Sequence, residues 1–154
     1  MRLLTHINRR YSRQLALHLL PAFALSVLSL TAPAQAQGTP MDDLLGTEWL
    51  LEDLGGSGVI DNARATLAFP ERGKVTGNGS CNRFFGSVEF TGDLVSFGNM
   101  GATRMQCADA VSDQEQRYLA ALQAAYRMSS DGTFLFVHSK SFEKPLRFTK
   151  LEKP

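Results

Sequence analysis

The two cysteines are the residues of this sequence best suited to chemistry. Cys81 lies in the stretch GNGSCNRFFG (77–86), and Cys107 ends the stretch TRMQC (103–107). A catalytic thiol needs a histidine beside it, a zinc site needs about four ligands, and a thioredoxin-like redox site needs C-x-x-C. Here 25 residues separate the cysteines, and the single histidine after residue 18 is His138, in a predicted strand. We therefore predict no catalytic residue, no metal site and no cofactor.

The N-terminal segment predicts where the chain acts. Residues 1–36 begin with a basic region, continue with an apolar run from about Leu15 to Leu30, and end in Ala34-Gln35-Ala36. This order is typical of a secretory signal peptide that is cut after Ala36. We expect Sec-type export in a bacterium, a periplasmic or secreted product, and no permanent membrane anchor after cleavage. No cysteine stands directly after the apolar run, so a lipoprotein is not expected.

Export favours one interpretation of the cysteine pair. An oxidising compartment and an even number of cysteines favour a disulfide between Cys81 and Cys107. Closing a loop of about 27 residues stabilises a fold by roughly 3–4 kcal/mol in the chain-entropy model. The alternative is a reactive thiol, which a labelling reagent would reach rapidly in the native protein.

Cleavage also changes the charge of the chain. Residues 37–154 hold twelve Lys and Arg against fifteen Asp and Glu, a net charge of −3. The positive charges are scattered singly, which argues against nucleic-acid binding. The remaining length suits one domain. We expect a flexible N-terminal arm over residues 37–43 and the folded domain over residues 44–154.

The sequence patterns of the folded domain predict short strands around one helix. Seven segments have the composition and the turn boundaries of strands, namely 48–54, 65–69, 74–76, 84–90, 94–97, 133–138 and 146–150. Ser112 and Glu115 form a capping-box pattern, in which each side chain accepts from the backbone N–H of the other, and they predict a helix over 113–127. Tyr118, Leu122 and Tyr126 recur on its buried stripe. The predicted fold is α+β, mostly β: a single domain with a curved antiparallel sheet or a partly open barrel packed on one amphipathic helix.

Strand parity separates neighbouring residues of the fourth segment. Phe84 and Gly86 share the predicted inward face, where a larger side chain at Gly86 would collide with the helix. Phe85 points the other way, which makes it a possible interface residue. The Asn-Gly dipeptide at 78–79 signals a two-residue hairpin, so Gly77 and Gly79 are expected to supply turn conformations.

The same stretches resemble the META domain family of heat-inducible, HslJ-like bacterial proteins. The resemblance covers about Leu44 to Leu151 and rests on W-L-L after Glu48, on G-N-G-S-C-N-R-F-F-G, on T-R-M-Q-C and on the helix that follows. The residues that match the family motif are taken as structural: Trp49, Gly77, Gly79, Asn82, Phe84, Gly86, Thr103 and Met105. The resemblance implies a role in heat shock or antibiotic tolerance, and it implies no catalytic residue.

Two functions follow from these observations. The first is a non-enzymatic, stress-related envelope protein that binds a partner protein not identified by the sequence. The alternative is a carrier of a hydrophobic or lipid ligand held between sheet and helix, which the mature chain's nine phenylalanines favour. A filled interior would favour the first function, and an internal cavity of a few hundred Å³ would favour the second.

Overall fold

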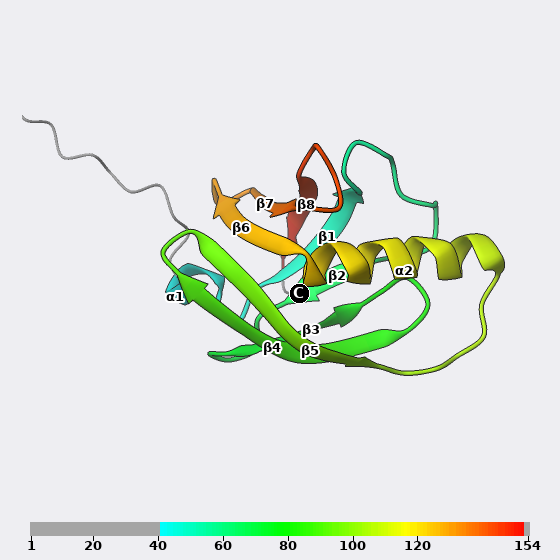
Figure 1. Ribbon diagram of the computed structural model, residues 1–154, viewed down its shortest axis with the longest axis horizontal. Coiled ribbons are helices and arrows are strands. Elements are labelled where there is room, and N and C mark those ends of the chain that lie inside the picture. The colour runs from blue at the N-terminus through cyan, green and yellow to red at the C-terminus, as the bar shows by residue number, and fades with distance from the viewer. Residues whose placement is uncertain (1–40, 153–154) are drawn as a thin grey trace, which may run out of the picture. The chain divides into compact units, whose positions relative to one another are not determined.

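An antiparallel barrel of eight strands packs against one face of a long helix (Figure 1). The computed structural model describes residues 41–152, so the predicted signal peptide and residues 37–40 of the predicted arm lie outside the described residues. Met41–Asp43, the rest of that arm, form the short helix α1 together with Leu44, whose side chain is buried. The other elements are β1 (Glu48–Asp53), β2 (Thr66–Ala68), β3 (Lys74–Asn78), β4 (Arg83–Thr91), β5 (Leu94–Ala102), α2 (Asp109–Gln123), β6 (Ala125–Ser130), β7 (Phe134–Ser139) and β8 (Leu146–Leu151).

The strands pair in chain order, and β8 returns to pair with β1. The seven predicted strands are confirmed, and the mostly β single domain with one main helix is confirmed as well. The sheet closes completely, whereas we expected a curved sheet or a partly open barrel. The reason is an eighth strand, β6, which pairs with β7 over most of its length and with β5 at Leu94↔Arg127.

The interior of the barrel is filled by large side chains. Tyr118 of α2 is fully buried. Its ring packs edge-on against Phe84 of β4 at a centroid distance of 5.9 Å and in a tilted arrangement against Phe148 of β8 at 6.1 Å. Its hydroxyl donates to the Thr66 carbonyl at 3.1 Å. Burial raises the pKa of this hydroxyl well above its ordinary value. Other side chains with less than 2 % exposure complete the core, among them Leu51, Leu67, Leu122, Met128 and Leu135.

The start of α2 differs from the prediction. The helix begins at Asp109, and the Ala108 carbonyl accepts from the N–H groups of Val111 and Ser112, each at 3.0 Å. Ser112 therefore lies inside the first turn, and the predicted capping box with Glu115 is wrong, because no side chain caps this helix. The Glu115 carboxylate instead accepts from three N–H groups of the β3–β4 loop, a better set of partners than one helix N–H.

The end of α2 also comes earlier than predicted. The helix ends at Gln123, and the next residues form β6. Tyr126, which we placed on the buried helical stripe, is 45 % exposed on this strand. The helical spacing continues past residue 123 by coincidence. The pairing of five β6 residues with β7 outweighs it because this pairing closes the barrel. In the part of the chain that the structure describes, no helix is long and apolar enough to span a membrane.

The position of Ser112 leads to a stability prediction. Ser112→Ala should leave the free energy of unfolding within about 0.5 kcal/mol of the parent value, because alanine is the better helix former and no cap is lost. Urea denaturation followed by circular dichroism measures this. A loss of about 1–2 kcal/mol would mean that the Ser112 hydroxyl does cap the helix in solution.

The glycines of the β3–β4 connection serve close packing rather than turn geometry. β3 continues through Asn78, which pairs with Arg83, so the connection is the four-residue loop 79–82 and not a two-residue turn at 78–79. Neither Gly77 nor Gly79 has a positive φ, whereas Ser80 has φ 104°. A Cβ on Gly77 would lie 2.1 Å from the Thr66 carbonyl oxygen, and one on Gly79 would lie 2.7 Å from a Glu115 carboxylate oxygen.

Gly86 is also explained differently from the prediction. A Cβ on Gly86 would lie 2.8 Å from Cγ of Met100 and 3.0 Å from the Asn99 carbonyl oxygen. The neighbour that excludes a side chain is therefore β5 and not the helix. The strand pairing shifts register between Gly86 and Val88, and this bulge brings β5 close to the glycine.

Candidate functional site

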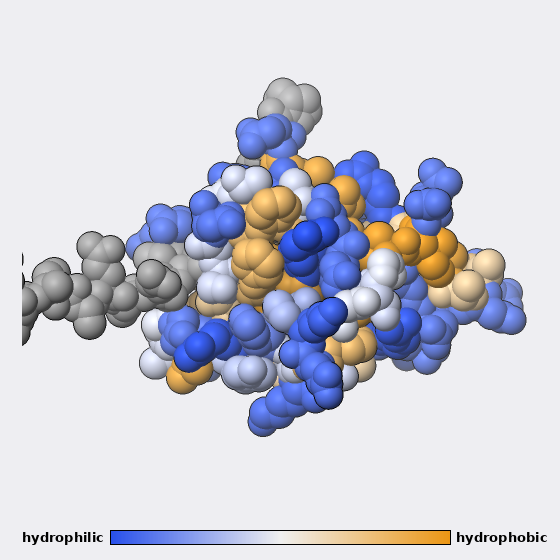
Figure 2. Space-filling model, turned by 90° about the horizontal axis from the view of Figure 1, so that it is seen from above, coloured by the Kyte–Doolittle hydropathy of each residue, from blue (hydrophilic) through white to orange (hydrophobic). Residues whose placement is uncertain are grey.

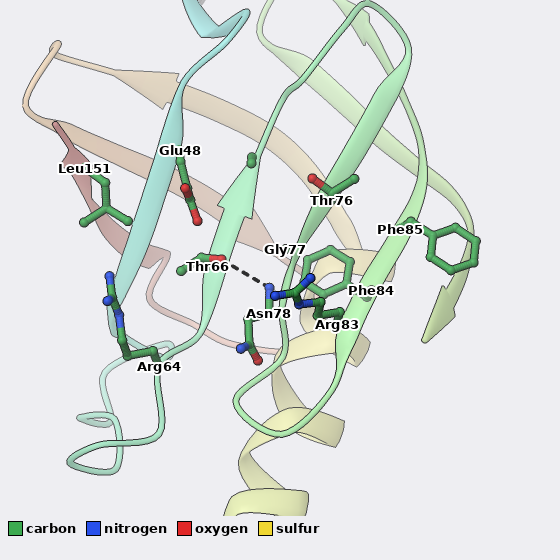
Figure 3. A pocket seen from close by; sticks show the side chains of 11 residues that line it. Glu48, Arg64, Thr66, Thr76, Gly77, Asn78, Arg83, Phe84, Phe85 and Leu151 are labelled. Carbon is green, nitrogen blue, oxygen red and sulfur yellow. Dashed lines mark hydrogen bonds between the residues drawn. The ribbon is translucent and has the colours of Figure 1, made fainter. Parts of the chain in front are cut away.

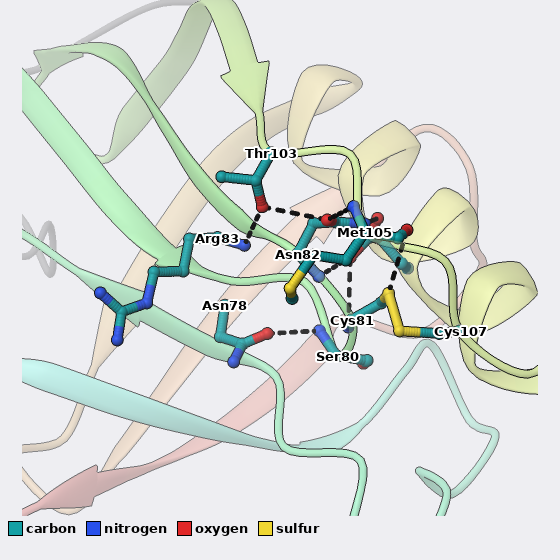
Figure 4. Close-up of a disulfide and its surroundings, with 9 residues drawn as sticks. Asn78, Ser80, Cys81, Asn82, Arg83, Thr103, Met105 and Cys107 are labelled. Atoms are coloured by element: carbon teal, nitrogen blue, oxygen red, sulfur yellow. Dashed lines mark hydrogen bonds between the residues drawn. A yellow bond between two sulfur atoms is a disulfide. The ribbon is translucent and has the colours of Figure 1, made fainter.

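The cysteines and the family-motif residues form a cluster that ties three segments of the chain together (Figure 4). Cys81 and Cys107 are joined in a disulfide with an S–S length of 1.98 Å, and no free cysteine is present in the described chain. The bond fastens the segment 103–107, which leads from β5 to α2, onto the β3–β4 loop. Cys81 is 6 % exposed, so the pair is suited to a structural role.

Asn82 is the centre of this cluster, which we call the Asn82 clasp (Asn82, Thr103, Met105, Glu115 and the disulfide). The buried Asn82 side chain accepts from the Thr103 hydroxyl at 3.0 Å and from the Met105 N–H at 2.7 Å. Its amide group donates to Glu115 at 2.8 Å, and its backbone N–H donates to the other Glu115 oxygen at 2.5 Å. Glu115 also accepts from the Cys81 N–H at 3.2 Å. One asparagine thus connects the β3–β4 loop, the segment 103–105 and helix α2.

The clasp offers no reactive centre. Every functional group of Asn82 is engaged in hydrogen bonds within the chain, and the two sulfur atoms are bonded to each other. Residues 41–152 contain no group of three His, Cys, Asp or Glu side chains placed to hold a metal ion. The remaining motif residue, Trp49, is 2 % exposed in the core, and its Nε1–H donates to the Thr47 hydroxyl at 2.8 Å. The motif residues therefore stabilise the fold, through hydrogen bonds of the clasp and through core packing.

A second site lies on the outer surface of the barrel, across strands β1 to β4 (Figure 3). It is an open groove of about 700 Å³, which we call the outer groove. Strand register explains its shape, because residues that face each other across neighbouring strands form transverse rows. One such row, called the transverse row below, consists of Leu151, Glu48, Ala68, Thr76 and Phe85. Small side chains occupy the middle of this row and larger ones its two ends, which leaves a hollow between them.

The floor of the outer groove is a weakened seam between β2 and β3. The two strands pair at Ala68↔Thr76 and again at the isolated bridge Ala65↔Gly79. Between these pairs the Thr66 carbonyl accepts from the Tyr118 hydroxyl inside the barrel, and the Asn78 N–H donates to the Thr66 hydroxyl at 3.1 Å. A side-chain bond thus replaces a ladder bond. Gly77 and the edge of the Phe84 ring form part of the groove lining at this seam.

Two arginines and one glutamate supply the charge of the outer groove. Arg64 lies two residues before β2, Arg83 is the first residue of β4, and Glu48 is the first residue of β1. Figure 3 shows Arg64 and Arg83 on opposite sides of the seam at Thr66 and Asn78. Among the described residues neither arginine has a carboxylate within 4.0 Å; the four ion pairs there join other residues.

Phe85 stands at the β4 side of the groove. Its side chain is 62 % exposed, as strand parity predicted, and its ring is turned away from Arg83 and Asn78 and covers Gly101 of β5 (Figure 3). Other large apolar residues with substantial exposure lie outside the groove, namely Ile60, Leu94, Met105 and Tyr126. Figure 2 shows that apolar residues on the face it presents form small patches broken by polar ones. Of the two exposed aromatic residues named here, Phe85 and Tyr126, Phe85 is the one that lines the outer groove.

The structure brings together some of the predicted residues and separates others. Asn82, Thr103, Met105, Glu115 and the cysteines meet in the clasp, whereas Phe85 lies apart from them in the outer groove. Sequence reasoning missed Arg64 and Arg83 as site residues. The signal that could have found them is parity, since Arg83 and Phe85 are two positions apart on the same outward face of β4.

Comparisons with known proteins agree with this fold. The model of the META domain family matches residues 42–153. An NMR structure of a protein from Burkholderia xenovorans is 24 % identical, with a TM-score of 0.60 over 73 % of this chain and 87 % of that one. A second protein structure determined by NMR is 20 % identical, with a TM-score of 0.60 over 72 % of this chain and 94 % of that one. No curated protein matches the sequence. The barrel, the clasp and the family match lead to one conclusion: this chain belongs to the META domain family.

Proposed function

We propose that this chain is an exported protein of the bacterial cell envelope that acts without catalysis, by binding a partner protein at the outer groove. The observation that carries the proposal is Phe85, an aromatic side chain 62 % exposed beside a groove of about 700 Å³. Aromatic and arginine side chains are enriched at protein interfaces relative to the rest of the surface. Phe85 and Arg83 present both kinds on one strand face.

The packing of the barrel supports a protein partner over a hydrophobic ligand. A lipid carrier needs an internal cavity of a few hundred Å³. Tyr118, Phe84, Phe148 and Trp49 occupy the space between α2 and the sheet with 2 % exposure or less. The outer groove, in contrast, is open to solvent and lined by both polar and apolar residues, which suits a segment of another protein.

The cellular setting of the proposal comes from the sequence. The signal-peptide pattern of residues 1–36 supports export, and the disulfide is consistent with an oxidising compartment. A role in heat shock or antibiotic tolerance is part of the proposal, and the family resemblance is its support.

Site-specific crosslinking tests the proposal. A photo-crosslinking phenylalanine analogue is placed at position 85 of the full chain in heat-stressed cells, and adducts are analysed for proteins and for lipids. The control places the same analogue at Tyr126, which is exposed on β6 outside the groove. We expect a discrete protein adduct at position 85 that is absent at position 126. Equal adducts at both positions, or lipid adducts alone, would contradict a partner-binding groove.

Phe85→Ala provides a matched loss-of-function variant. The captured partner should no longer co-purify with it, with binding weakened by at least about tenfold, because an anchor of the interface is lost. The thermal midpoint of the variant should change little, since most of the ring faces solvent. A variant that unfolds would show that Phe85 acts as a structural cover of Gly101 instead.

A further inference from the structure

The charged lining of the outer groove limits the chemistry of what it can bind. Two of its three charged residues are arginines, although residues 37–154 carry an excess of acidic side chains. Four Lys and Arg residues of the described chain form ion pairs, among them Arg127 with Asp93 at 2.9 Å and Arg147 with Glu52 at 3.5 Å, and seven, Arg64 and Arg83 among them, do not. Arg64 and Arg83 have no such partner in the described residues. The groove therefore has positive charge available for an incoming group.

The two arginines are placed to act on one ligand. Thr66 and Asn78 lie between them at the seam, and Arg83 is opposite Asn78 in the β3–β4 register. Strands two apart in a sheet are separated by roughly 10 Å, and alternate side chains of an extended peptide are about 7 Å apart. Arginine side chains are long enough to cover the difference. Two carboxylates on one face of an extended segment thus match two guanidinium groups, each able to form a bidentate pair.

The rest of the lining favours a peptide over a small anion. The groove extends along the transverse row, from Leu151 and Glu48 at one end to Phe85 at the other. A small anion would contact the arginines alone. An extended segment would also place an apolar side chain against the exposed Phe85 ring. Glu48 repels an acidic group at the β1 end, so the acidic residues are directed toward the seam.

We propose that the outer groove binds an extended acidic segment of the partner protein, with Arg64 and Arg83 pairing its carboxylates and Phe85 contacting an apolar residue further along the same face of the segment. This inference rests on the proposed function, since it names the chemistry of the partner for the same groove. The carboxylate pairs set the selectivity, and the apolar contact sets the position of the segment.

Peptide binding to the purified protein tests the inference. The probes are three fluorescein-labelled octapeptides that carry leucine and two residues of aspartate, asparagine or lysine at successive positions of one extended face, with serine elsewhere, and binding is measured by fluorescence anisotropy. We expect the aspartate peptide to bind at least about tenfold more tightly than the asparagine peptide, and the lysine peptide to bind most weakly. Raising the salt concentration from about 50 mM to about 500 mM should remove most of this preference.

Charge-reversal variants test whether the two arginines are responsible. Arg64→Glu and Arg83→Glu should each weaken aspartate-peptide binding by about tenfold, and the double variant should prefer the lysine peptide. Arg117→Glu is the matched control: Arg117 lies on α2 outside the groove, over the Phe142 ring, and the same charge change should alter binding by less than about twofold. Thermal melts establish that each variant is folded.

The outcomes separate this inference from the function on which it rests. Equal affinity for the aspartate and asparagine peptides, or equal weakening by Arg117→Glu and Arg83→Glu, would overturn the acidic segment. If the position-85 crosslink to a protein persisted in that case, the groove would still bind a partner, but one of different chemistry. Loss of the crosslink as well would remove both proposals.

Discussion

Asn82→Asp should destabilise the fold by about 3–5 kcal/mol at neutral pH, because it places an uncompensated carboxylate against another one. The Asn82 amide nitrogen, which donates to Glu115 at 2.8 Å, becomes a second carboxylate oxygen at the same place. Glu115 is already held there by the backbone N–H groups of Cys81 and Asn82, so it cannot withdraw without losing those bonds. Urea denaturation at pH 7 measures the loss.

The same variant should recover stability in mild acid. In the folded variant the two carboxylates bind one proton more tightly than they do in the unfolded chain, where they are apart. A folded state that binds the extra proton gains stability as the pH falls, so the deficit relative to the parent should shrink between pH 7 and about pH 5. Asn78→Asp is the control, since Asn78 accepts from the Ser80 N–H at 3.0 Å through its oxygen, which aspartate retains. That variant should lose less than about 1 kcal/mol. Similar losses for both variants, with no recovery in acid, would mean that the clasp is not formed as described.

Removal of the disulfide should lower the free energy of unfolding by about 2–5 kcal/mol. The variant is the pair Cys81→Ser and Cys107→Ser, which opens a link across a sequence separation of 26 residues. The larger conformational freedom of the unfolded chain accounts for most of the loss. The fold itself should persist, because Asn82 still connects Thr103, Met105 and Glu115 through hydrogen bonds.

Thiol chemistry provides the complementary measurement. Protein that is purified and denatured without reductant should show no free thiol, and the native protein should resist labelling because Cys81 is 6 % exposed in a bonded pair. Rapid labelling of either cysteine in native protein, combined with an unchanged denaturation midpoint in the double variant, would establish a reactive thiol in place of the structural bond.

The clasp and the outer groove are connected through β4. Asn82 directly precedes Arg83 and lies three residues before Phe85, and both of these β4 residues line the groove. The Arg83 N–H donates to the Thr103 hydroxyl at 3.2 Å, so the start of β4 is held by the same residue that contacts Asn82. The residues of the family motif therefore fix the strand that presents the candidate binding side chains. Under the proposed function, the motif would support binding by holding the strand that carries Arg83 and Phe85.

Local patterns were sufficient for seven of the eight strands and for the cysteine pair. The outward position of Phe85 follows from the period-two alternation of β4, and the turn at Gly92, where φ is 63°, follows from the Thr-Gly-Asp sequence that joins β4 to β5. The pairing of Cys81 with Cys107 followed from their even number and the export pattern. Each of these features depends on a few consecutive residues or on composition, which a single sequence contains in full.

The tertiary structure decided the features in which distant segments compete for the same group. Glu115 has the spacing of a capping residue for Ser112, but its carboxylate serves Cys81 and Asn82, more than thirty positions earlier, because together they offer three N–H donors. The Thr66 carbonyl is used by Tyr118 of the helix, and this loss of a ladder bond leaves the seam that becomes the outer groove. Arg64 and Arg83 lie 19 positions apart in sequence and share the groove only through the register of three strands. Local sequence fixes what a residue can bond to, and which partner it takes depends on the free energy of the whole closed barrel.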